Sequence, residues 1–140
     1  MSTTSRVLLI LGGIVGVLTA VYMFRTAGDL PAQIPMQYDG NGEVTWYATR
    51  DGFWLFVLLP WLGLSALFLA TARRAVSVAW AFLWINAFAF FVYDLTYDQA
   101  TGDAIIGVSP GGFIAIMFAF VAVLIVLAIR DKSRLGAPRY

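Results

Sequence analysis

Four long apolar stretches without a single charged residue divide the chain, and polar segments join them. The stretches are Val7–Phe24, Phe53–Ala70, Ala75–Tyr93 and Gly112–Ile129. A helix rises about 1.5 Å per residue, so about 20 apolar residues match a hydrocarbon core of roughly 30 Å. The pattern therefore predicts an all-α fold, an integral membrane four-helix bundle that forms a single membrane domain over residues 1–140.

The charges between the stretches separate by sign. If the stretches cross a membrane in turn, seven of the nine basic residues share one side: Arg6, Arg73, Arg74, Arg130, Lys132, Arg134 and Arg139. Seven of the eight acidic residues share the other: Asp29, Asp39, Glu43, Asp51, Asp94, Asp98 and Asp103. Because basic loops stay in the cytoplasm, both termini are expected there. Residues 25–52 and 94–111 then form outer loops, and residues 130–140 form a cytoplasmic tail.

The amino-acid composition limits the classes of function that the chain can have. Hydrophobic residues make up 61% of the chain and charged residues 12%, which excludes an ordinary soluble domain. The chain has no cysteine and no histidine, so it lacks thiolate ligands and the usual general base. No stretch carries the ionisable groups that a membrane enzyme, pump, channel or charged-solute transporter normally needs. We expect no enzymatic activity, no cofactor, no metal and no nucleic-acid partner, and keep a small oligomeric transporter of neutral solutes as an alternative.

Three features inside the stretches concern helix packing. Gly12 and Gly16 have a spacing that lets a second helix approach closely, within the protomer or across a homodimer. Pro60 leaves the Phe56 carbonyl without its helical partner, which predicts a static kink, with a moving hinge as the alternative. Asn86 is an amide in an apolar stretch and must find a partner, so a structural hydrogen bond is favoured over a ligand contact.

The first outer loop, 28 residues over 25–52, is too long for a simple turn. Its prolines favour extended backbone, and Asp39–Gly42 has the composition of a tight turn. Trp46 and Tyr47 suit the headgroup layer and would lead the chain back to the membrane. We expect an ordered loop that lies flat on the outer surface. A calcium loop is the weaker reading, because an EF-hand needs glycine and glutamate where Val44 and Arg50 stand.

The second outer loop contributes acidic residues, which we interpret as solvated anions. Together the two loops predict an outer recognition surface. Its candidate residues are Leu30, Pro31, Ile34, Pro35, Gln37, Asp39, Glu43, Trp46, Tyr47, Asp94 and Asp98.

The segment Leu30–Glu43 resembles the first conserved segment of the SdpI-like family of small multi-pass bacterial membrane proteins, which includes immunity and signal-transduction proteins. The matching positions are Leu30, Pro31, Ile34, Pro35, Gly42 and Glu43, with Pro60 in the following helix. The resemblance covers roughly Val7–Leu62, corresponding to the family's N-terminal domain of unknown function. Gln37 stands where family members commonly have histidine, and the acidic residue expected after Glu43 is missing. The resemblance implies a bacterial inner-membrane location.

Two hypotheses follow from the residues and the resemblance. In the first, an SdpI-like protein binds an extracytoplasmic peptide, toxin or envelope ligand through its outer loops, in an immunity or signalling role. In the second, the chain is an accessory subunit whose partners are the lipid bilayer and other membrane-protein helices, of its own kind or of a larger complex.

Overall fold

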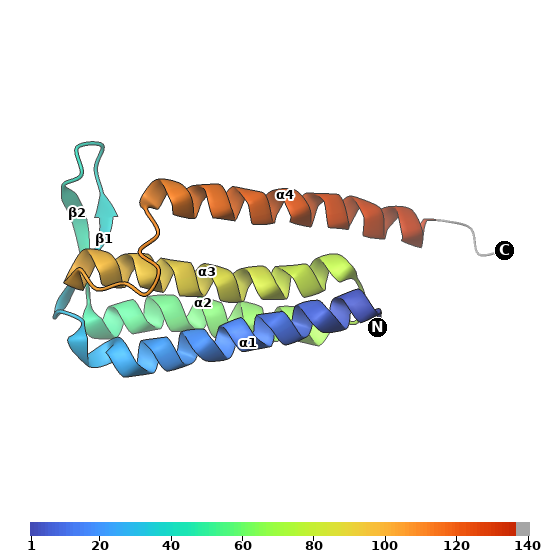
Figure 1. Ribbon diagram of the computed structural model, residues 1–140, viewed down its shortest axis with the longest axis horizontal. Coiled ribbons are helices and arrows are strands. Elements are labelled where there is room, and N and C mark those ends of the chain that lie inside the picture. The colour runs from blue at the N-terminus through green and yellow to red at the C-terminus, as the bar shows by residue number, and fades with distance from the viewer. Residues whose placement is uncertain (137–140) are drawn as a thin grey trace.

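The computed structural model describes residues 1–136 and contains four long helices and one β-hairpin (Figure 1). The elements in chain order are α1 (Thr3–Thr26), the 3-10 turn η1 (Ala27–Asp29), β1 (Gln33–Tyr38), β2 (Val44–Thr49), α2 (Arg50–Thr71), α3 (Val76–Thr101) and α4 (Pro110–Leu135). All four helices are long and apolar enough to cross a membrane, which confirms that prediction and is compatible with a multi-pass membrane protein. The all-α expectation was wrong in one respect, because part of the first predicted loop pairs as two strands.

Three of the helices begin at a polar cap. Side-chain oxygens of Ser2, Thr49 and Ser109 accept backbone N–H groups at the starts of α1, α2 and α4. Each cap satisfies a donor that the first helical turn leaves without a partner. The start of α3 is capped differently, because Ala75 has no side-chain oxygen. The Asp131 carboxylate, which belongs to α4, accepts the Ser77 N–H at 2.8 Å.

The helices run in alternating directions and so define two ends of the molecule (Figure 1). At the hairpin end, α1 and α3 finish and α2 and α4 begin, with the hairpin beside them. At the arginine end lie the N-terminus, the short turn with Arg73 and Arg74, and the finish of α4. The predicted tail residues Pro138 and Arg139 lie outside the described residues.

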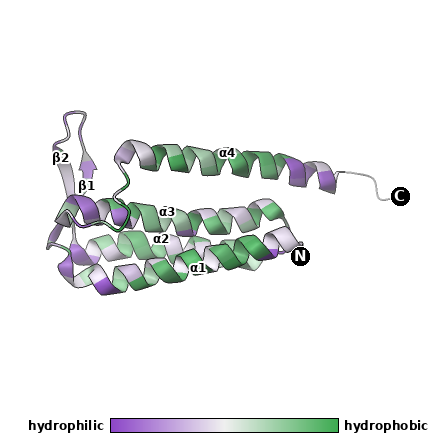
Figure 2. Cartoon of the chain, in the orientation of Figure 1, coloured by the Kyte–Doolittle hydropathy of each residue, from purple (hydrophilic) through white to green (hydrophobic). Residues whose placement is uncertain are grey.

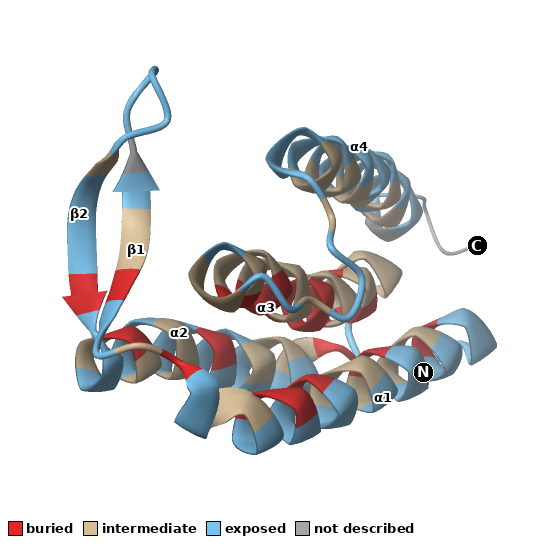
Figure 3. Ribbon diagram, turned by 60° about the vertical axis from the view of Figure 1, so that its left-hand side comes forward, coloured by how far each residue is buried: buried red, intermediate tan, exposed pale blue. Residues whose placement is uncertain are grey.

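α3 is the centre of the fold. It packs against α1, α2 and α4, whereas α4 packs chiefly on α3 and lies on the outside (Figure 3). The part of α4 that is apolar enough to cross a membrane contains no buried residue, compared with 44% buried for that of α3. The predicted four-helix bundle is therefore a three-helix core, with the fourth helix laid on one side of it.

Apolar side chains cover the outside of the helices, and polar residues gather towards their ends (Figure 2). Phe24, Phe118 and Ile129 are among the many large apolar residues left exposed. A soluble protein would bury such residues, whereas a lipid environment solvates them. The packed core concentrates towards the hairpin end. It comprises Tyr22, Met23, Leu30, Ile34, Ala48, Phe53, Trp61, Ile85, Ala89, Tyr93 and Tyr97.

Candidate functional site

The predicted tight turn forms the tip of the hairpin. The Asp39 carboxylate accepts the backbone N–H groups of Asn41 and Glu43, each at 2.9 Å. The Asp39 N–H donates to the Glu43 carbonyl, and Gly42 adopts a φ of 82° that glycine tolerates without strain. The Asp39 carboxylate thus has a structural role in holding the turn.

The two strands pair antiparallel and run across the helix axes (Figure 1). Ile34 lies opposite Ala48 and Gln37 lies opposite Trp46, with register irregularities on either side of Gln37. A two-stranded sheet has no inner strand, so Pro35 occupies an edge, where its missing N–H is tolerated. The turn was predicted from the sequence, but the strands on either side of it were not.

The base of the hairpin is anchored in the core. Leu30 and Ile34 are fully buried, so they are not part of the exposed recognition surface on which they were predicted. Their apolar side chains gain more from the core than from water. Arg50 reinforces the base, because its guanidinium donates to the Leu30 carbonyl and its backbone N–H donates to that of Ala32.

The exposed side chains of the hairpin include two aromatic rings. Trp46 and Tyr47 are 47% and 50% exposed, and Trp46 makes an edge contact with Phe56 at a centroid distance of 6.2 Å. Glu43 and Gln37 are also exposed, as is the capping residue Asp39, while Pro31 and Pro35 are half-buried. The hairpin therefore presents aromatic and acidic groups together on a pinned scaffold.

Asp94 organises the α3–α4 loop instead of facing solvent. The sequence placed it on an exposed loop, but α3 continues past Tyr93 to Thr101, and Asp94 is 1% exposed. Its carboxylate accepts the Tyr22 hydroxyl at 2.8 Å and three backbone N–H groups, from Ile105, Ile106 and Gly107, at 2.9, 3.3 and 3.1 Å. Four donors compensate the loss of water around the carboxylate, which explains how this charge is buried. Asp98 lies one turn further along α3 and is half-buried.

Tyr22, which donates to this carboxylate, belongs to a group of three tyrosines that the sequence analysis did not describe as a group. Tyr22 packs edge-on against Tyr93 and Tyr97, with ring centroids 5.0 and 5.8 Å apart. The Tyr93 hydroxyl bonds Thr26 at 2.6 Å, and the Tyr97 hydroxyl donates to Asp29 at 3.2 Å. The spacing of Tyr93 and Tyr97, four residues apart on one helix face, was the available signal. These bonds connect the C-terminal end of α1 and the following turn to the C-terminal part of α3.

Three of the four residues predicted for helix packing, Gly12, Gly16 and Asn86, lie in the middle of the three-helix core. A Cβ built on Gly12 would lie 2.6 Å from the Phe82 ring, and one built on Gly16 would lie 2.5 Å from Asn86 Oδ1. Asn86 accepts the Trp61 indole N–H at 2.9 Å and donates to the carbonyl of Phe82 at 2.8 Å. Asn86 thus joins α1, α2 and α3, and the two glycines face α3 of the same chain.

Pro60 and its neighbours border an apolar cavity of about 350 Å³ between α2 and α3. Met36 of the hairpin reaches this cavity as well, as do Phe56 and Trp61. The helix continues through the proline from Arg50 to Thr71.

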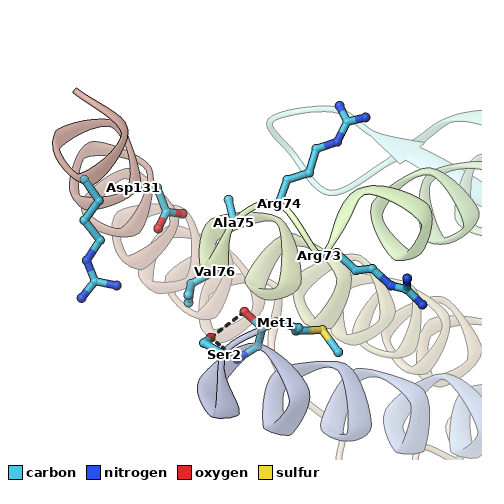
Figure 4. Close-up of a pocket in the computed structure, with 9 residues that line it drawn as sticks. Met1, Ser2, Arg73, Arg74, Ala75, Val76 and Asp131 are labelled. Atoms are coloured by element: carbon cyan, nitrogen blue, oxygen red, sulfur yellow. Dashed lines mark hydrogen bonds between the residues drawn. The ribbon is translucent and has the colours of Figure 1, made fainter. Parts of the chain in front are cut away.

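At the arginine end, a cavity of about 260 Å³ is bordered by Arg73, Arg74 and Arg134 together with the N-terminal residues. Figure 4 shows the Arg73 and Arg74 side chains extending in different directions. Asp131, also on this cavity, caps α3. Divergent guanidinium groups suit separate contacts with lipid headgroups better than the binding of one small anion.

A family described as a domain of unknown function, DUF1648, matches residues 14–64. No curated protein and no solved structure matches the chain. The matched segment runs from within α1 through the hairpin to within α2, and it overlaps the Val7–Leu62 segment that carries the SdpI-like resemblance. The family description assigns no activity, so the SdpI-like assignment stays a prediction. The match covers the hairpin and its anchors but not α3, which carries Asn86 and Asp94.

Proposed function

We propose that this protein is a non-enzymatic, SdpI-like membrane protein that binds an extracytoplasmic peptide through its hairpin, in an immunity or signalling role. In this proposal it resides in a bacterial inner membrane with both termini in the cytoplasm, as the distribution of basic residues favours.

The observation that carries the proposal is the pinned hairpin with exposed aromatic and acidic groups. Burial of Leu30 and Ile34 holds its base, while Glu43, Trp46 and Tyr47 remain exposed. A pre-organised surface loses little conformational entropy on binding, and exposed aromatic residues supply most of the energy in many interfaces. An ordered hairpin of this kind is better suited to recognition than a flexible loop.

The charges favour a basic ligand. The hairpin end contains Asp29, Asp39, Glu43, Asp51, Asp98 and Asp103 beside only two arginines. Complementary charge accelerates encounter with a cationic partner and disfavours anionic ones. The unpaired edges of β1 and β2 offer main-chain groups to an extended peptide, which could add to the sheet as a further strand. An amphipathic cationic peptide matches the acidic charge of the hairpin end and can pair in extended form with a strand edge.

The test measures binding of a synthetic amphipathic Lys/Leu peptide to the full chain in phosphatidylcholine nanodiscs, with empty nanodiscs as reference. We expect saturable binding to the protein that weakens several-fold in Glu43→Gln and in Tyr47→Ala. Asp51→Asn is the matched control for the loss of one negative charge at the same end, because Asp51 is exposed but belongs to α2 and not to the hairpin. Asp39 is a poor choice for this test, since its carboxylate holds the turn.

Two results would contradict the proposal. The first is binding no stronger than to empty nanodiscs. The second is equal affinity of the wild type and both hairpin variants, which would show that the peptide is recognised elsewhere.

The second candidate function, an accessory subunit of a larger membrane complex, is favoured by α4. Its outward face carries large exposed apolar residues, including Ile114, Phe118 and Ile125, which could pack against another helix. Native mass spectrometry after gentle extraction from the source membrane separates the two candidates. Stoichiometric co-purification with a large complex supports the subunit, and a single chain or small homo-oligomer supports the stand-alone binder.

A further inference from the structure

A groove of about 670 Å³ lies between α1 and α3 at the hairpin end, where the α3–α4 loop folds back along α3 (Figure 1). We call it the α1–α3 groove. Its lining is mainly apolar and includes Leu18, Val21, Phe90 and Ile105. This volume is within the range of known small-molecule sites. The hairpin strands take no part in its lining, so it is separate from the peptide surface proposed above.

The groove changes character along the helix axis. On α1, the lining residues Leu18, Val21, Tyr22 and Arg25 share one face and extend about 10 Å along the helix. The apolar residues lie towards the middle of the span, and Arg25 lies in the last turn of α1. A membrane changes in the same direction, from hydrocarbon to headgroup layer. The groove is thus apolar at hydrocarbon depth and charged at headgroup depth.

Two charged groups at the mouth of the groove are not used by the fold. The hydroxyl of Tyr22 donates to Asp94, and that of Tyr97 donates to Asp29. Asp103 donates its backbone N–H to the Thr101 hydroxyl, and its carboxylate takes no part in that bond. Among residues 1–136, the hydrogen bonds involve neither the Asp103 carboxylate nor the Arg25 guanidinium, and both residues are exposed. The mouth therefore offers one cation and one anion.

We propose that the α1–α3 groove binds one membrane phospholipid with an ethanolamine headgroup. An acyl chain lies along Leu18, Val21 and Phe90, the phosphate contacts Arg25, and the primary ammonium contacts Asp103. A guanidinium is suited to a phosphate, and an ammonium donates hydrogen bonds to a carboxylate. A choline headgroup cannot donate these bonds, and an anionic glycerol headgroup offers no cation to Asp103.

The test is native mass spectrometry of the full chain released from nanodiscs that contain phosphatidylethanolamine, phosphatidylcholine and phosphatidylglycerol with identical acyl chains. We expect one retained lipid per protein, with phosphatidylethanolamine favoured about two- to fivefold over each of the others. Arg25→Gln should reduce retention of all three lipids. Asp103→Asn should lower phosphatidylethanolamine to the level of phosphatidylcholine.

Matched controls and a blocking variant make the result interpretable. Arg6→Gln changes an arginine at the opposite end of α1, and Asp98→Asn changes a nearby acid outside the groove lining; both should retain lipid like the wild type. Val21→Trp should fill the groove and abolish retention, while circular dichroism verifies that the variant is folded.

Equal retention of the three lipids would overturn the inference, as would a preference that survives in Asp103→Asn or lipid that remains in Val21→Trp. A dimer without bound lipid would overturn it as well, by assigning the groove to a second copy. None of the variants changes a hairpin residue, so binding of the peptide to the hairpin can be measured separately in each of them.

Discussion

At the residue scale, the contact between Gly16 and Asn86 fixes how closely α1 and α3 approach. Asn86 cannot move aside freely, because it accepts from Trp61 and donates to the carbonyl of Phe82. A side chain at position 16 must therefore push the helices apart or break these bonds. Replacing Gly12 or Gly16 would therefore disturb the packing of this chain itself, since both glycines face α3.

Gly16→Ala tests this contact. We expect a loss of about 1–3 kcal/mol in the free energy of unfolding, because its Cβ would lie 2.5 Å from Asn86 Oδ1. Reversible denaturation in mixed micelles measures the change. Gly13→Ala is the control, with nothing within 4 Å of its Cβ, and its stability should be unchanged or slightly raised. Equal effects of the two substitutions would disprove the close approach.

The Trp61–Asn86 hydrogen bond is measurable by a double-mutant cycle of Trp61→Phe and Asn86→Ala. We expect a coupling free energy of about 0.6–1.7 kcal/mol, the range found for hydrogen bonds between membrane helices. Trp84→Phe provides the comparison, because the buried Trp84 indole nitrogen has no hydrogen-bond partner within residues 1–136. Its removal should show no coupling to Asn86.

At the scale of elements, Asp94 decides the path of the α3–α4 loop. Its four donors come from α1 and from three consecutive backbone positions of the loop, so one carboxylate joins α1, α3 and the approach to α4. The apolar stretch ended at Tyr93, which is why the sequence analysis placed Asp94 outside a helix. The backbone bonds of a helix do not require apolar side chains, and α3 ends instead at Thr101, followed by the C-cap Gly102 with a φ of 78°.

Asp94→Asn should release this loop. The amide cannot accept four hydrogen bonds as the carboxylate does, and bonds to charged groups contribute about 1.5–3 kcal/mol. Hydrogen exchange at the Ile105 and Gly107 amides should accelerate at least about tenfold, the factor that corresponds to 1.4 kcal/mol. In Asp98→Asn the same amides should keep their protection. Unchanged exchange in Asp94→Asn would mean that other contacts hold the loop.

At the scale of the whole molecule, the fold is a three-helix core with α4 added to the face of α3. Stacking of Trp80 on Phe120 and the Asp131 cap on Ser77 hold α4 at separate points along its length. The exposed apolar surface and the polar ends give the molecule the profile of a membrane protein (Figure 2). The separation of basic from acidic residues along the helix axis then favours one orientation in the membrane.

Cysteine labelling tests that orientation directly, because the chain has no native cysteine. With a membrane-impermeant maleimide, we expect Asn41→Cys at the hairpin tip to react in intact cells. Thr4→Cys at the arginine end should react only after the membrane is opened. The reverse pattern would place the hairpin in the cytoplasm and remove the basis for an extracytoplasmic ligand.

The sequence alone allowed the prediction of some parts of this fold and not others. The four apolar stretches predicted the four helices, and Asp39–Gly42 predicted the turn. The strands were missed, although Val44–Tyr47 has the β-branched and aromatic composition typical of strands. Leu30 and Ile34 were predicted on the surface because their place in a loop says nothing about which helices cover them.

What the sequence by itself determined is the number of long apolar helices and the separation of charge between their ends. Both depend on properties that add up over neighbouring residues. These are the free energy of transferring a stretch into lipid and the backbone hydrogen bonds that a helix makes within itself. Only the tertiary structure decided that Asp94 is buried, that Gly16 faces Asn86 and that Arg25 shares a groove with Asp103. These pairings join residues far apart in the chain, and they form only once whole helices have packed at a particular rotation and distance.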